Sequence, residues 1–89
     1  MQPAAADWLQ RFRTHLATER RLSAHTVSGY ARDLAALARW CDRNGIERWQ
    51  GLDSQHVRRF AAHSHAAGLG PRSLARRLAA LRTFCEYLL

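Results

Sequence analysis

The apolar residues of this chain repeat at helical spacing in four segments. Recurrence at i, i+3, i+4 and i+7 is typical of an amphipathic helix that packs one face on a core. β-branched residues nowhere alternate with polar ones over four or more positions, so no strand is predicted. The predicted helices run roughly from Ala4 to Arg20, from Ser23 to Asn44–Gly45, from Asp53 or Ser54 to about Ala67, and from near Pro71 to the end. We therefore predict an all-α fold.

Each predicted helix has one apolar stripe that should face the core. The stripes consist of Ala5, Trp8, Leu9, Phe12 and Leu16; Val27, Tyr30, Leu34, Leu37, Ala38 and Cys41; Val57, Phe60, Ala61 and Ser64; and Leu74, Leu78, Leu81, Cys85 and Leu88, flanked by Phe84. The opposite faces of the second and fourth helices hold His25, Ser28, Gly29, Arg32, Ala36, Arg39 and Arg43, and Arg72, Arg76, Ala79 and Thr83. Tryptophans at 8, 40 and 49 are expected to pack in the core rather than stack on bases.

The helix ends have clear signals except at the C-terminus. Ser23 is a favourable N-cap, Asn44–Gly45 is a standard helix stop, and the glycines and proline of residues 68–71 form a tight turn. The last predicted helix has no stop signal and ends on apolar residues. With 89 residues the chain suits one domain, and we expect it to be a piece of a longer protein.

An excess of basic residues predicts a polyanionic partner. Fourteen basic residues face seven acidic ones, which gives a formal net charge of +7. All fourteen are arginine, a choice that agrees with the codon usage of a GC-rich genome, but such codon usage does not explain the excess over acids. A surface with this charge attracts nucleic acid, or less often an anionic membrane surface.

Residues that catalyse reactions or bind metals show no recognisable arrangement. Cys41 and Cys85 lie on apolar stripes, where free cysteine behaves as a small hydrophobe. His63 and His65 are close in sequence but would point to different sides of a helix. No nucleophile elbow, P-loop or zinc-protease motif occurs. We expect no catalytic residues, no metal and no cofactor in this chain.

The sequence also predicts where the protein resides. No apolar run approaches the about 20 residues that cross a bilayer, and the N-terminus does not resemble a signal peptide. We expect a cytoplasmic protein with reduced thiols and no membrane partner.

The beginnings of two predicted helices have features suited to a phosphate. Residues 23–26 (SAHT) and 70–73 (GPRS) each offer free backbone N–H groups and hydroxyls. Each helix then has arginines on the face away from its leucines. A helix fits the major groove of DNA, where arginine can pair with guanine or hold a phosphate. A solvated helix face is the other interpretation of these arginines.

Three stretches resemble the Xer-type tyrosine recombinases and phage integrases. Residues 22–34 (LSAHTVSGYARDL) are similar to the family pattern L-S-x-x-T-x-x-x-Y-x-x-D-L. Residues 73–88 (SLARRLAALRTFCEYL) are similar to S-x-x-R-x-L-x-A-L-R-x-F-x-x-Y-L. The opening stretch, from Trp8–Leu9 through residues 16–23, also fits. The resemblance covers nearly the whole chain and is closest to XerC-like members, although XerD-like members and phage integrases share the pattern.

This resemblance implies a four-helix SAM-like core-binding domain over residues 1–89. In the family, this domain and a catalytic domain form a C-shaped clamp around duplex DNA. The tyrosine nucleophile belongs to the catalytic domain, which we expect this chain to lack; Tyr30 and Tyr87 match structural positions. The implied DNA-binding residues are His25, Thr26, Ser28 and Arg32 on the second helix and Arg72, Ser73, Arg76 and Arg77 on the fourth. Arg82 also matches a family arginine, with a structural role and a DNA contact both open.

The resemblance further implies a role for the parent protein. It would resolve chromosome dimers before cell division at a dif-like site, together with a XerD-like partner and other recombinase subunits, and without a cofactor. Three other interpretations remain at this point: the corresponding domain of another recombinase of the phage-integrase type, a helical protein-interaction module that uses the apolar end at residues 84–89, and a small helix-turn-helix regulator. The length of the second helix disfavours the last.

Overall fold

Four α-helices and one short 3-10 helix make up the protein in a computed structural model that describes all residues 1–89, with no strand. The elements are α1 (Pro3–Thr18), α2 (Ala24–Arg43), η1 (Trp49–Gly51), α3 (Ser54–Ala66) and α4 (Pro71–Leu88). The predicted all-α fold and its four helices are confirmed. The largest difference at a helix end is in α1, which ends at Thr18 rather than at Arg20.

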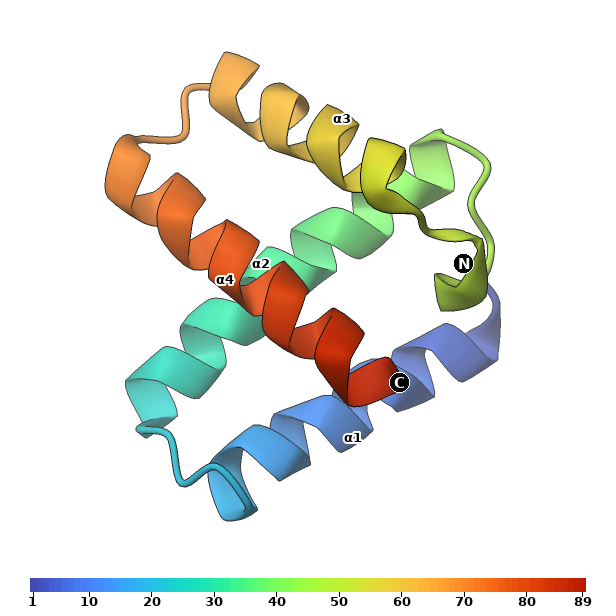
Figure 1. Ribbon diagram of the computed structural model, residues 1–89. Coiled ribbons are helices and arrows are strands. Elements are labelled where there is room, and N and C mark those ends of the chain that lie inside the picture. The colour runs from blue at the N-terminus through green and yellow to red at the C-terminus, as the bar shows by residue number, and fades with distance from the viewer.

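The helices form two antiparallel pairs that cross each other. Figure 1 shows α1 beside α2, α3 beside α4, and α4 lying across α2. Helix α2 therefore contacts α1 on one side and α4 on another, while α4 contacts both α2 and α3. Because α2 is covered from two directions, it buries a broader sector than a single apolar stripe provides.

Aromatic side chains fill the centre of the core. Phe84 is completely buried, and its ring centroid lies 5.0 Å from that of Phe12 and 5.0 Å from that of Trp49. The indole Nε1 of Trp49 donates a hydrogen bond to the carbonyl oxygen of Ala5 at 3.0 Å, which attaches the segment between α2 and α3 to α1. Trp40 packs against Phe60 with centroids 5.8 Å apart. The tryptophans thus pack as the sequence predicted.

Capping side chains define where α2 and α3 begin. The Ser23 hydroxyl accepts a hydrogen bond from the Thr26 amide at 3.1 Å, which confirms the predicted N-cap. At α3, Asp53 accepts from the His56 amide at 2.9 Å, and the Asp53 amide donates to Nδ1 of His56 at 3.1 Å. This reciprocal pair identifies Asp53 rather than Ser54 as the cap. The hydrogen bond from the His56 amide also lowers the pKa of Asp53.

The rotation of α4 about its axis differs from the prediction. Leu78, predicted to face the core, is 36 % exposed, whereas Ala80, Leu81 and Phe84 are buried. Arg77 is half-buried on the inner side. The predicted stripe was wrong at Leu78 because α4 packs into the angle between α2 and α3, and this places residues 77, 80, 81 and 84 inward.

Gly29 is also buried, although the sequence placed it on the polar face of α2. The side chain of Arg76 from α4 covers it: a Cβ atom at Gly29 would lie 3.5 Å from Cδ of Arg76. The Arg76 side chain therefore lies over α2 at a position where α2 has no side chain.

Replacing Gly29 by alanine is expected to stabilise the domain. Glycine inside a helix costs about 0.5–1 kcal/mol relative to alanine, and the added methyl group would make an ordinary contact with Arg76. We expect the Tm in thermal unfolding followed by circular dichroism to rise by about 2–8 °C. Gly45→Ala is the matched control, since its φ of +73° strains alanine and should lower the Tm. A lower Tm for Gly29→Ala would show that the α2–α4 contact has no room for a methyl group.

Candidate nucleic-acid interface

No acid is exposed on α2 as far as Cys41 or on α4 as far as Arg82. Asp33 is the only acidic residue among residues 24–41 and 71–82, and it is completely buried. We call the exposed polar residues on the first halves of these two helices the α2–α4 face. The α2–α4 face consists of His25, Ser28, Arg32, Arg72 and Arg76.

Arg76 connects the two helices of the α2–α4 face. Its Nε and Nη2 atoms donate to the two carboxylate oxygens of Asp33 at 2.9 and 3.0 Å. The contact with Gly29 places Arg76 next to Ser28 and within one helical turn of Arg32. The side chain of Arg76 nevertheless remains 41 % exposed. Among the sequence-predicted residues, Arg76 of α4 therefore lies near Ser28 and Arg32 of α2.

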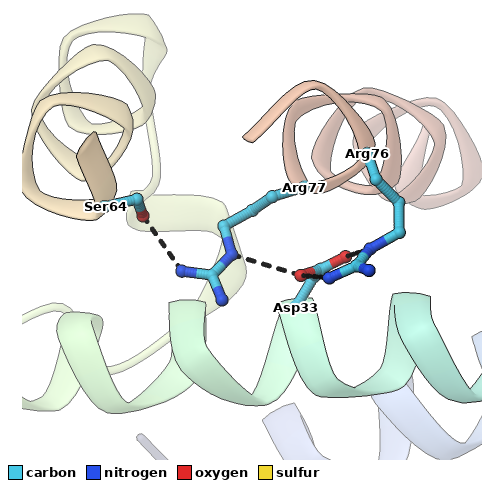
Figure 2. A network of polar contacts seen from close by, with 4 residues as sticks. All are labelled: Asp33, Ser64, Arg76 and Arg77. Carbon is cyan, nitrogen blue, oxygen red and sulfur yellow. Dashed lines mark hydrogen bonds and ion pairs between the residues drawn. The ribbon is translucent and has the colours of Figure 1, made fainter. Parts of the chain in front are cut away.

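Arg77 takes part in the same network from a more buried position. Its Nε donates to Asp33 at 3.2 Å and its Nη1 donates to Ser64 of α3 at 3.0 Å, with the guanidinium 5.5 Å from the centroid of Phe60. Figure 2 shows both guanidinium groups converging on Asp33. Arg77 is 17 % exposed and joins three helices, so its guanidinium already has partners inside the protein, unlike the exposed arginines of the α2–α4 face.

Asp33 was not singled out by the sequence analysis, although a signal was present. It follows Tyr30 and precedes Leu34 and Leu37 at helical spacing, so an acid interrupts the apolar sector of α2. A buried carboxylate needs charged or hydrogen-bonding partners. The two adjacent arginines of α4 provide them, and this pattern could have indicated the pairing.

The remaining predicted contact residues divide into exposed and half-buried side chains. His25, Ser28, Arg32 and Arg72 are exposed and make no side-chain hydrogen bond or ion pair. Thr26 is half-buried, and its Oγ1 accepts from the Ser23 hydroxyl at 3.0 Å as part of the helix cap. Half-buried Ser73 lies in the first turn of α4. Arg82, for which the sequence left two roles open, is exposed.

The cysteine and tyrosine side chains are all buried or half-buried. Burial raises the pKa of Cys41 to about 11 and also raises that of Cys85, so both thiols are protonated at neutral pH. Tyr30 and Tyr87 pack against the hydrophobic core.

No three His, Cys, Asp or Glu side chains are grouped so that they could hold a metal ion. No helix combines the length and apolar character needed to cross a membrane.

Comparison with known proteins gives a family match over most of the chain. Residues 9–89 match the family described as phage integrase, N-terminal SAM-like domain. The chain is 48 % identical over 81 residues to a tyrosine recombinase XerC of Azotobacter vinelandii, which covers 91 % of this chain and 27 % of that protein. It is 46 % identical over 86 residues to a tyrosine recombinase XerC of Xanthomonas campestris, covering 97 % of this chain and 27 % of that protein. The chain thus spans about a quarter of the length of these relatives. No solved structure matches it significantly.

Proposed function

Because the chain belongs to the phage integrase N-terminal SAM-like domain family, we propose that it binds duplex DNA as part of a XerC-type site-specific tyrosine recombinase. The observation that carries this proposal is the α2–α4 face, on which every charged side chain is basic and the one nearby carboxylate is buried. Arginines arranged in this way attract phosphates, and the release of counterions from DNA drives their binding.

The proposed contacts come from both helices of the crossing. They are His25, Thr26, Ser28 and Arg32 of α2 and Arg72, Ser73 and Arg76 of α4. The first turns of both helices still offer backbone N–H groups to phosphates, although the Thr26 amide is bonded to Ser23 and Pro71 has no N–H. Arg39 and Arg82, also exposed, extend the positive surface along each helix.

We further propose an activity for the whole protein to which this domain belongs. Cleavage and rejoining of DNA would be performed by a catalytic domain outside these 89 residues. The recombinase would resolve chromosome dimers at a dif-like site in the cytoplasm, with a XerD-like partner and other recombinase subunits. The sequence identity to proteins called tyrosine recombinase XerC supports this assignment.

Binding to duplex DNA is expected to be weak and strongly dependent on salt. One domain without the rest of a clamp should bind any duplex with a Kd of roughly 10⁻⁴ to 10⁻⁶ M at physiological salt. Replacing Arg32 and Arg72 by alanine should weaken binding. It should also lower the slope of log K against log salt by about 2, since each lost phosphate contact removes about 0.9. Fluorescence anisotropy with a labelled duplex at several salt concentrations measures both quantities.

The matched control removes two arginines from other surfaces. Arg13 of α1 and Arg58 of α3 are exposed, and their double change to alanine alters the net charge by the same amount. We expect the control to retain most of the affinity and slope. An equal loss in both double variants would contradict the α2–α4 face. Absence of binding at low salt by a folded sample would contradict DNA binding itself and favour a protein-interaction module.

A further inference from the structure

The carboxylate of Asp33 accepts hydrogen bonds from two N–H groups on the same side of the Arg76 guanidinium. A guanidinium has five N–H donors in a planar fork. The carboxylate accepts from Nε at 2.9 Å and from Nη2 at 3.0 Å, which is one side of that fork. Nη1 makes no hydrogen bond in the structure, so the outer edge of the guanidinium, with one N–H from each Nη atom, is free. The side chain is 41 % exposed, so this free edge is accessible.

The orientation of Arg76 is held from two directions. Asp33 is completely buried and also accepts from Arg77 at 3.2 Å, so its carboxylate cannot easily rotate. The aliphatic part of Arg76 lies against Gly29 of α2. By contrast, Arg32 and Arg72 make no side-chain hydrogen bond or ion pair and can adopt many rotamers. Hydrogen bonding to Asp33 also raises the pKa of Arg76, so the guanidinium stays protonated.

We propose that Asp33 is a positioning residue that fixes the guanidinium of Arg76, so that its free N–H pair recognises guanine in the major groove. This inference rests on the proposed binding of duplex DNA. Arg32 and Arg72 would hold phosphates without regard to sequence, whereas Arg76 would give the domain a base preference.

The charges at this site favour a base over a phosphate as the partner of Arg76. Asp33 offsets one of the two positive charges of Arg76 and Arg77, so the cluster attracts a phosphate less than two free arginines would. Two parallel N–H groups match the O6 and N7 acceptors of guanine, and this pairing depends on direction more than on net charge. A guanidinium already held in place also loses little side-chain entropy when it forms these bonds.

The test is selection of bound duplexes from a pool with a randomised central segment, followed by sequencing. The unmodified domain should enrich G·C over other pairs at one position by about fivefold or more. Arg76→Lys keeps the charge but cannot form the planar fork, so it should lose this enrichment. Arg72→Lys is the matched control on the same helix and should keep the enrichment.

Asp33→Asn separates positioning from a purely structural role. If the variant folds by circular dichroism, it should lose the G·C enrichment with unweakened binding to the unselected pool, because an amide cannot accept both bonds of Arg76. If it does not fold, the G·C enrichment measured for Arg76→Lys decides whether Arg76 gives the base preference. Salt-dependent binding without base preference, or enrichment that survives Arg76→Lys, would overturn this inference and leave DNA binding in place. No binding of the pool at low salt would overturn both.

Discussion

Phe84→Ala should lower the free energy of unfolding by about 3–5 kcal/mol, the usual cost of emptying a phenylalanine site in a core. Phe84 is completely buried, and its ring meets those of Phe12 and Trp49 at centroid distances of 5.0 Å each. The cavity would open where α1, α4 and the segment before α3 meet. Since small domains are stable by only about 5–15 kcal/mol, a large part of the total would be lost. Urea unfolding followed by circular dichroism, analysed at constant m value, measures the change.

Cys85→Ala is the control for this prediction because the two positions are adjacent on α4. The apolar pattern placed Cys85 on the inner stripe with Phe84 at its flank, whereas the structure buries Phe84 and leaves Cys85 half-buried. We expect a much smaller loss for Cys85→Ala. Equal losses at the two positions would be incompatible with the observed rotation of α4.

Asp33→Ala should cost about 3 kcal/mol of stability, because it leaves the half-buried guanidinium of Arg77 without its carboxylate. The change also removes both hydrogen bonds of Arg76 to α2, so the α2–α4 crossing loses its polar attachment. The same urea unfolding experiment applies. Adding Arg77→Met to Asp33→Ala should recover part of the loss, since the uncompensated charge is then removed as well.

Asp42→Ala is the control for Asp33→Ala. Asp42 also lies on α2 and pairs with the amino group of Met1, but its side chain is 52 % exposed. An exposed ion pair contributes little to stability because water solvates both charges once they separate. If Asp33→Ala destabilised the domain no more than Asp42→Ala does, the buried network would not hold α2, α3 and α4 together.

Local features of the chain were readable from the sequence alone. Helix periodicity, the Ser23 cap, the Asn44–Gly45 stop and Pro71 at the start of α4 all depend on residues within a few positions of one another. The same holds for the basic surface of α2, because residues three and four apart on a helix necessarily share a face. Helix count, most helix ends and the exposed arginines of α2 were therefore predictable before any tertiary contact was known.

Contacts between helices determined which residues of α4 are buried and which arginines stay exposed. Leu78 is exposed and Arg77 is half-buried because α4 packs between α2 and α3, and a single apolar stripe cannot reveal a helix that is covered from two sides. The sequence placed Arg76 on the face opposite the apolar stripe, but it could not show that Arg77 beside it bonds to Asp33 and Ser64 in the interior. Their difference comes from Asp33, 43 and 44 residues away in the chain, whose buried carboxylate binds one arginine at the surface and the other inside. The amphipathic pattern thus determined which elements form, and the helix crossing determined which arginines remain available to a partner.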